Sequence, residues 1–148
     1  MKQTKLFDLS GSVAIITGGN GGIGRSIAMG LANAGASVAI FGRNEEKNQK
    51  TLVELKEINP NSMALQVDIS NNSELAPAIQ KVEKELGNIT ILVNNAGIIN
   101  VSGGILNESI EDWNAVMDTQ LKAVFLLSKL VAKSMAQHKK GKIINIGS

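Results

Sequence analysis

Five glycines lie within seven residues near the start of the chain, directly after an apolar run at residues 13–16. The segment reads Thr17-Gly18-Gly19-Asn20-Gly21-Gly22-Ile23-Gly24. A backbone without Cβ atoms turns sharply and points free N–H groups at a phosphate on the N-terminus of the following helix. The segment therefore predicts a site for the pyrophosphate of a dinucleotide, formed by Thr17, Gly18, Asn20, Gly22, Ile23 and Gly24.

The spacing of these glycines is a weak signal by itself, because 15 glycines in 148 residues produce similar patterns by accident. The alternative interpretation is a flexible turn. The apolar run before the loop and the helix-like stretch from Arg25 favour the phosphate site, since they give a strand, a glycine-rich turn and a helix start in the required order.

Arg43 follows a second apolar run, residues 38–41, where a cofactor with a free ribose 2′-hydroxyl usually meets an Asp or Glu. The charge is reversed in this chain, and a guanidinium group suits a 2′-phosphate. Arg43 therefore favours NADP as the cofactor, with NAD possible. The alternative is a solvated arginine at a strand end.

Further candidate site residues follow the other apolar runs of the chain. Asp68 and Ile69 come after the third run, and Asp68 could accept a hydrogen bond from an adenine amino group. It could equally be a turn residue or a helix cap together with Ser70. The fourth and fifth runs are followed by Asn94, Asn95, Ala96 and Gly97, and by Ser148.

Alternating elements must bring these residues together. Apolar runs predict strands at residues 13–16, 38–41, 63–67, 89–93 and 143–146, and helical periodicity predicts helices at 23–33, 45–58, 74–86 and 110–137. The alternation predicts an α/β fold, a doubly wound, Rossmann-like parallel sheet in one domain spanning residues 1–148. In the order 3-2-1-4-5, the carboxyl ends of the strands would place the candidate residues around one cleft.

Local signals mark where the helices begin. Asn44 is expected to cap the second helix, and Ser109 with Asp112 resembles a capping box for the fourth. We expect Ser73 to cap the third helix, which would put Pro77 among the first residues, where its missing N–H costs nothing.

The long fourth helix carries an apolar stripe that is expected to face the core and that includes one amide, Gln120. Because a buried amide needs partners, Gln120 is either a satisfied structural residue or part of a buried polar relay. A second apolar side, at Leu126, Leu127 and Leu130, is buried either within the chain or in a subunit interface, so a homo-oligomer, dimer or tetramer, is one expectation. The stripe comprises Trp113, Val116, Met117, Leu121, Val124, Ser128 and Val131.

Composition excludes several classes of function. The net charge is +2 with mixed signs along the chain, so nucleic acid is not an expected partner. No apolar run reaches the roughly 18 residues of a membrane span, and we expect a cytoplasmic protein that binds a small-molecule substrate. The chain has no cysteine and a single histidine, His138, which argues against a metal site.

Together these motifs resemble those of the short-chain dehydrogenase/reductase family over nearly the whole chain. The pattern Thr17-Gly18-x-x-x-Gly22-x-Gly24 is similar to its cofactor loop, and Asp68 is similar to its adenine contact. Residues 94–97 are similar to the motif that stabilises its central sheet and borders the nicotinamide. The resemblance implies hydride transfer between NADP or NAD and an alcohol or ketone carbon.

The resemblance also implies catalytic residues. Ser148 stands where the family places the serine that holds the substrate oxygen, and Gln120 stands where it usually has an Asn that supports a proton relay. The family's acid or base is a tyrosine hydroxyl whose pKa is lowered by a lysine four residues later. This chain contains no tyrosine, so the Tyr-x-x-x-Lys element is missing and the C-terminal part of the fold with it.

Two explanations of the missing tyrosine remain open at this point. The 148 residues are the N-terminal portion of a longer single-domain enzyme, or a short protein that binds a nucleotide without catalysis. For the enzyme, the run from Asn94 to Asn100 and the helix around Trp113 to Ser128 are most similar to dehydrogenases of gluconate-type sugar acids, with 3-oxoacyl-carrier-protein reductases as the alternative.

Overall fold

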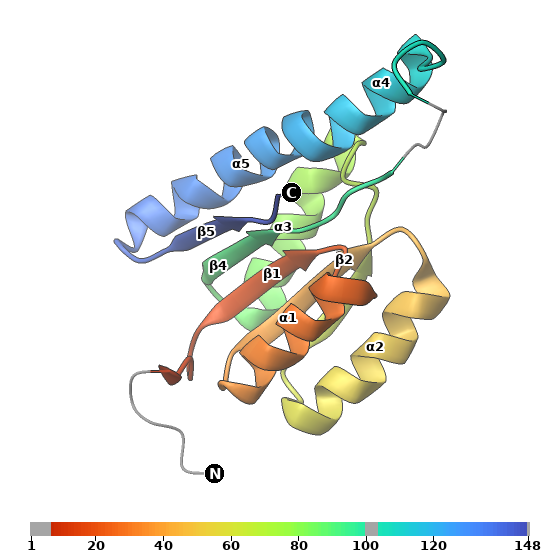
Figure 1. Cartoon of the computed structure of the whole chain (residues 1–148). Coiled ribbons are helices and arrows are strands. Elements are labelled where there is room, and N and C mark those ends of the chain that lie inside the picture. Colours follow the sequence, from red (N-terminus) through yellow and green to blue (C-terminus); the bar gives the residue numbers. More distant parts are fainter. Residues whose placement is uncertain (1–6, 100–103, 148) are drawn as a thin grey trace.

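Five parallel strands form one sheet in the part of the chain that the computed structural model describes, residues 7–99 and 104–147 (Figure 1). The sheet order is β3-β2-β1-β4-β5, which confirms the predicted fold class and strand order. Each strand differs from its predicted range by no more than one residue at either end. The strands are β1 (Val13–Thr17), β2 (Ser37–Gly42), β3 (Met63–Gln66), β4 (Ile89–Asn94) and β5 (Lys142–Asn145).

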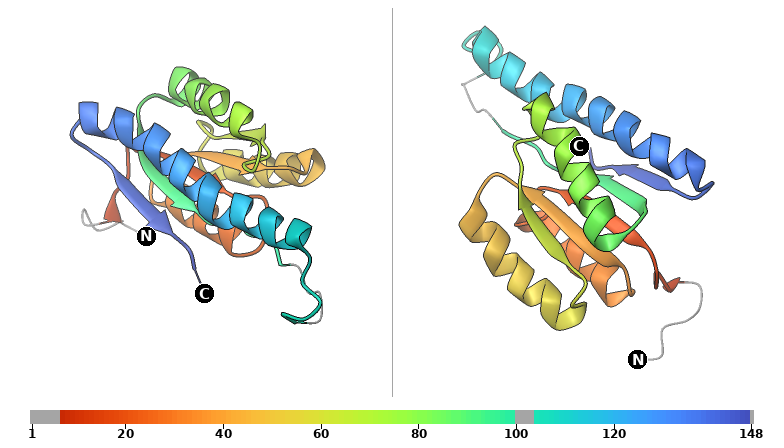
Figure 2. Two further views of the ribbon diagram at one scale, coloured as in Figure 1. Left: turned by 90° about the horizontal axis from the view of Figure 1, so that it is seen from above. Right: turned by 180° about the vertical axis from the view of Figure 1, so that it is seen from behind.

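The sheet is covered on both faces, as its apolar strands require. Side chains alternate along β1, so Val13 and Ile15 enter one core while Ala14 and Ile16 enter the other. The second core is closed by α1 (Gly22–Asn33) and α2 (Glu45–Ile58). Figure 2 shows α3 (Asn72–Leu86) and α5 (Ala123–Gln137) on the opposite face, where they close the first core.

The start of α3 differs from the prediction. Asn71, and not Ser73, is the N-cap: its Oδ1 accepts hydrogen bonds from the backbone N and the hydroxyl of Ser73, at 3.2 and 2.8 Å. The helix begins at Asn72, so Pro77 is its sixth residue and lies inside the helix rather than in the first turn. The predicted caps at Asn44 and Ser109 are confirmed, because they accept hydrogen bonds from the backbone N of Lys47 and Asp112.

The prediction of one continuous α-helix at residues 110–137 is wrong, because a π-helical turn interrupts the segment. The structure has α4 (Ile110–Met117), a π-helical turn η2 (Asp118–Lys122) and then α5. A π-turn inserts one residue into the helical repeat and rotates every side chain after it. The buried face of α5 is therefore Ala123, Leu127, Val131 and Met135.

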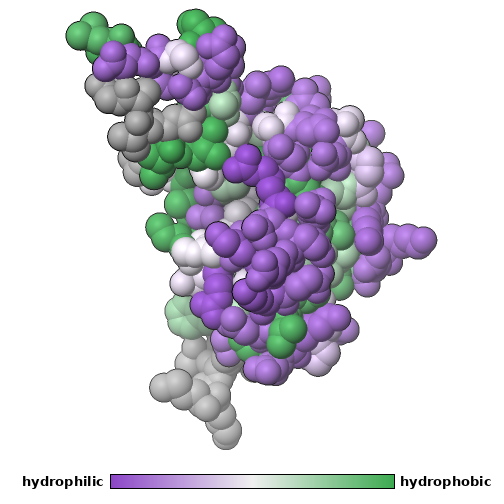
Figure 3. Space-filling model, turned by 90° about the vertical axis from the view of Figure 1, so that its right-hand side faces the viewer, coloured by the Kyte–Doolittle hydropathy of each residue, from purple (hydrophilic) through white to green (hydrophobic). Residues whose placement is uncertain are grey.

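The prediction that the stripe faces the core is wrong at two of its largest side chains, one in α4 before the π-turn and one within the turn. Trp113 is 53% exposed and Leu121 is 58% exposed, whereas Val131 is buried as predicted. Figure 3 shows that hydrophobic residues gather toward the α4 end of a face that is otherwise mostly hydrophilic. In the described part of the chain, no helix is both long enough and apolar enough to cross a membrane.

Of the five described strands, β5 departs most from burial on both faces. All four of its residues are exposed, and the following Ile146 is 40% exposed as well. One edge of β5 pairs with β4 in parallel, from Lys142 opposite Ile91 to Asn145 opposite Asn94. The described helices therefore cover the three central strands β2, β1 and β4 more fully than β5.

The corrected cap of α3 is directly testable. We expect Asn71→Ala to lower the free energy of unfolding by about 1 kcal/mol, because it removes the acceptor for the N–H of Ser73. Ser73→Ala removes only a hydroxyl that donates to the cap, and its effect is expected to stay within about 0.5 kcal/mol. Urea denaturation of the two variants measures both values; a larger loss for Ser73→Ala would contradict the assignment of the cap.

Candidate functional site

A cleft of about 320 Å³ opens at the carboxyl ends of the central strands. This volume falls within the range of small-molecule sites, and the position is the usual ligand position in open α/β sheets. The cleft brings together residues at the carboxyl ends of four strands and one residue of the π-turn, Thr119. They are Gly18, Asn20, Gly21, Phe41, Gly42, Arg43, Val67, Asp68, Ile69, Asn95, Ala96, Gly97, Ile98 and Thr119.

The glycine loop forms one wall of the cleft and depends on close backbone approaches. Gly18 and Gly22 have φ of +64° and +49°, which side chains rarely adopt. A Cβ at Gly24 would overlap the carbonyl oxygen of Gly18, so the start of α1 lies directly against the end of β1. These positions explain why the sequence needs glycine at several points of the loop.

The N-terminus of α1 is suited to an anion. Gly21 is the N-cap and offers no side-chain hydrogen bond, and the first turn contains no acidic residue. The first N–H groups of a helix lack intrahelical partners and carry the positive end of the helix dipole. Gly18, Asn20 and Gly21 line the cleft at this point.

Thr17 does not line the cleft but ties its two walls together. Its buried hydroxyl accepts hydrogen bonds from the backbone N of Asn95 and of Ala96, both at 3.0 Å. The side chain of Asn95 adds a second connection, because its Nδ2 donates to the carbonyl oxygens of Thr17 and Gly18 at 3.0 and 3.4 Å. The ends of β1 and β4 are thus held side by side.

Asn94 anchors the fourth and fifth strands beneath the cleft. Its Nδ2 donates to Oδ1 of Asn145 at 2.8 Å and to the hydroxyl of Ser128 at 3.2 Å. The backbone carbonyl of Asn94 also accepts from the N of Ile146 at 2.9 Å. Asn94 is 4% exposed, so it positions the segment of residues 95–97 rather than lining the cleft.

Asp68 lies at the cleft and also forms the turn that the sequence offered as an alternative. Its Oδ1 accepts from the backbone N and the hydroxyl of Ser70, at 3.0 and 2.7 Å. Its backbone N donates to Oε2 of Glu74 at 2.8 Å, which fixes the turn to the start of α3. Ile69 is buried beside it and contributes an apolar lining.

Arg43 stands at the outer end of the cleft, where a second, shallower hollow adjoins it. This hollow is lined by Asn20, Arg43, Asn44 and Lys47, so two cationic side chains face the same space. The backbone carbonyl of Arg43 accepts from Nε2 of Gln66 at 3.0 Å. Within the described residues its guanidinium has no hydrogen bond or ion pair, so the group is available to an anion.

Gln120 lies in the π-turn and is exposed, so the expectation that it faces the core is wrong. Its amide is nevertheless partnered, because Oε1 accepts from the backbone N of Ile98 at 3.0 Å. A Cβ at Gly97 would lie 3.5 Å from Cδ of Gln120, so the amide packs against the segment after β4. The other candidate catalytic residue, Ser148, lies outside the described residues.

The structure separates the candidate residues into two groups. Gly18, Asn20, Arg43, Asp68, Ile69, Asn95, Ala96 and Gly97 line the cleft, whereas Thr17, Gly22, Ile23, Gly24 and Asn94 do not. The predicted site did not include six of the lining residues, which are Gly21, Phe41, Gly42, Val67, Ile98 and Thr119. Thr119 lies next to Gln120 in the π-turn, and because the sequence does not reveal this turn, no pattern could have identified Thr119.

This site and fold belong to a known class. The profile of the family described as short chain dehydrogenase matches residues 12–148, and the chain belongs to this family. The match covers every described strand and helix. The resemblance inferred from the glycine loop and from residues 94–97 is thereby confirmed.

Three similar proteins illustrate the likeness. A 2-dehydro-3-deoxy-D-gluconate 5-dehydrogenase of Formosa agariphila is 35% identical over 97% of this chain and 54% of its own length. The 3-oxoacyl-acyl-carrier-protein reductase FabG of Buchnera aphidicola is 36% identical over 100% of this chain and 57% of its own. A metagenomic short-chain oxidoreductase in complex with NADP has a TM-score of 0.90 at 34% identity, covering 95% of this chain and 63% of that one. The chain spans about half the length of the curated relatives it matches.

The contact between Thr17 and residues 95–96 generates a prediction. Thr17→Val leaves two backbone N–H groups without their acceptor, so we expect the free energy of unfolding to fall by about 1–3 kcal/mol. Thr17→Ser keeps the hydroxyl and is expected to lose less than half as much. Denaturant unfolding followed by circular dichroism distinguishes them, and equal stability of Thr17→Val and the native chain would show that the hydroxyl does not hold the walls together.

Proposed function

We propose that the chain is the cofactor-binding portion of an NADP-dependent oxidoreductase that transfers a hydride between a nicotinamide and an alcohol or ketone carbon. NAD remains the second cofactor to test. The observation that carries the proposal is the open N-terminus of α1 at one wall of the cleft, with Arg43 at the outer end of the same cleft. The NADP in the similar metagenomic oxidoreductase supports it.

The described residues fit such a cofactor along the whole cleft. The first turn of α1 offers free N–H groups to a pyrophosphate, and Arg43 with Lys47 offers positive charge to a 2′-phosphate. Asp68 and Ile69 border the space for an adenine ring, and residues 95–97 border the opposite end. When bound there, the nicotinamide supplies or accepts the hydride.

For the chemistry on the substrate, we propose that Ser148 holds the reacting oxygen. Gln120 supports the site by fixing the backbone of Ile98 rather than by contacting the substrate. A proton must also move in each turnover, and the 148 residues contain no tyrosine to carry it. We therefore propose that the chain belongs to a longer single-domain enzyme whose further residues supply the Tyr-x-x-x-Lys element.

The substrate class that we propose is a gluconate-type sugar acid. The identity to the dehydrogenase of Formosa agariphila supports it. The 36% identity to a 3-oxoacyl-acyl-carrier-protein reductase makes a 3-oxoacyl substrate the second candidate. A homo-oligomer is proposed from the exposed apolar side chains of η2 and α5, namely Leu121, Phe125 and Leu130.

The cofactor assignment is tested by binding. We expect Arg43→Ala to weaken NADPH about 10- to 100-fold, because a charge-assisted hydrogen bond to a phosphate is lost, while NADH binding stays nearly unchanged. The control is Lys56→Ala, which removes a cation from the last turn of α2, away from the cleft. Titration calorimetry gives both dissociation constants, and an unchanged ratio of the two in Arg43→Ala would refute the role of Arg43.

The proposed reaction is tested on the full-length protein. We expect the reading frame to encode Tyr-x-x-x-Lys beyond residue 148, and the purified protein to oxidise gluconate with NADP. Ser148→Ala is expected to lower kcat by at least about 100-fold with little change in NADPH affinity. A full-length protein that binds NADPH but has no such element would instead support binding without catalysis.

A further inference from the structure

Asn48, near the start of α2, is a fully buried amide that none of the motifs above includes. It is 0% exposed, and all of its polar atoms are used. Its Nδ2 donates to the carbonyl oxygens of Gly42 at 2.9 Å and Leu65 at 3.3 Å, and its Oδ1 accepts from Nδ2 of Asn20 at 2.7 Å. A buried polar group with every hydrogen bond made fixes the geometry of its partners.

The partners of Asn48 belong to three segments that surround the outer end of the cleft. Asn20 is in the glycine loop, Gly42 ends β2 directly before Arg43, and Leu65 is in β3. The carbonyl of Gly42 also accepts from the backbone N of Val67 at 3.1 Å. One side chain thus connects the loop proposed for the pyrophosphate to the backbone that carries the guanidinium.

The absence of a side chain at residue 42 makes room for this connection. A Cβ at Gly42 would overlap Nδ2 of Asn20 and would lie 2.5 Å from Oδ1 of Asn48. The two amides therefore fill the space next to the backbone of Gly42. Any larger residue there would push Asn20 away from Asn48.

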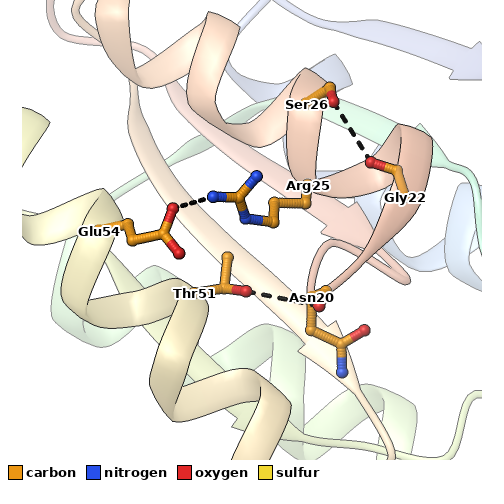
Figure 4. A network of polar contacts seen from close by, with 6 residues as sticks. All are labelled: Asn20, Gly22, Arg25, Ser26, Thr51 and Glu54. Carbon is orange, nitrogen blue, oxygen red and sulfur yellow. Dashed lines mark hydrogen bonds and ion pairs between the residues drawn. The ribbon is translucent and has the colours of Figure 1, made fainter.

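Two further residues of α2 contact the glycine loop and the helix that follows it. The hydroxyl of Thr51 donates to the carbonyl of Asn20 at 3.4 Å, and Glu54 forms an ion pair with Arg25 of α1 (Figure 4). The side chains of this ion pair are 42% and 45% exposed, so solvent weakens it. Asn48 is fully buried, so solvent does not weaken its hydrogen bonds in this way.

We propose that Asn48 is a positioning residue that sets the preference for NADP over NAD. It holds the glycine loop and the backbone before Arg43 at a fixed separation, so that a cofactor bound on the loop presents its 2′-phosphate to the guanidinium. The guanidinium of Arg43 has no hydrogen bond or ion pair among the described residues, so its place depends on the backbone that carries it. The proposal rests on the cofactor site of the proposed function.

The test uses the full-length protein and compares the affinities for NADPH and NADH of the native protein with those of two variants. Asn48→Leu keeps the volume of the side chain and removes all three hydrogen bonds. We expect NADPH binding to weaken about tenfold and NADH binding to change less than about threefold, measured by calorimetry. Thr90→Val is the matched control, because it also removes buried hydrogen bonds, to Val13 at the opposite end of the sheet. It is expected to leave the ratio of the two affinities unchanged.

A second variant protects the test against misfolding of Asn48→Leu. Asn20 is only partly buried, and Asn20→Ala removes the partner of Oδ1 without placing a new group in the core. We expect it to lower the preference for NADPH in the same direction. In the double variant, Asn48→Leu should add less than about twofold to the loss caused by Asn20→Ala, since both break one connection.

The outcomes separate this proposal from the one on which it rests. If the native protein does not prefer NADPH, the assignment of NADP fails and Asn48 has no preference to set. If the native protein prefers NADPH and Arg43→Ala abolishes that preference, but the Asn48 and Asn20 variants keep it, the cofactor assignment stands and Asn48 is overturned as a positioning residue. Additive losses in the double variant would also overturn it.

Discussion

The contact between the backbones of Gly18 and Gly24 is the constraint on which the cleft depends. No Cβ fits at Gly24, because the carbonyl of Gly18 occupies its place. The close contact between these two backbones brings the first turn of α1 to the end of β1. Asn95, directly after β4, donates from its Nδ2 to the same carbonyl. The ends of β1 and β4 and the N-terminus of α1 therefore all lie close to the carbonyl oxygen of Gly18. The other residues that line the cleft surround this contact.

Most of the architecture could be predicted from the sequence because it follows from local patterns. Buried parallel strands read as continuous aliphatic runs, and the side chains of Asn44 and Ser109 cap helices through contacts within three residues. The incorrect predictions concern features that local residue patterns do not determine. The π-turn at Asp118–Lys122 leaves no mark in the residue types, yet it shifts the buried face of the following helix, and Leu121 within the turn is exposed. Asn71 and Ser73 are both good caps, and only the backbone path chooses between them.

The candidate site divides in the same way. The glycine loop and the segment after β4 can be recognised in the sequence, because the backbone geometry at these positions requires particular residue types. Asn48 is not recognisable, because a polar residue near a helix start usually faces solvent, and its partners lie 6, 17 and 28 residues away in the chain. Gln120 is a third case: an amide within an apolar stripe marks it as a candidate, but its partner, the N–H of Ile98, is a backbone group that no pattern identifies.

The exposed strand β5 has a consequence for handling the protein. Its side chains Ile143 and Ile144 are 38% and 46% exposed, and within the described residues only β4 pairs with it. A free strand edge with apolar side chains is a template for hydrogen bonding to another chain. We therefore expect a preparation limited to these 148 residues to associate through its β5 edge, and we expect low protein concentration to reduce that association.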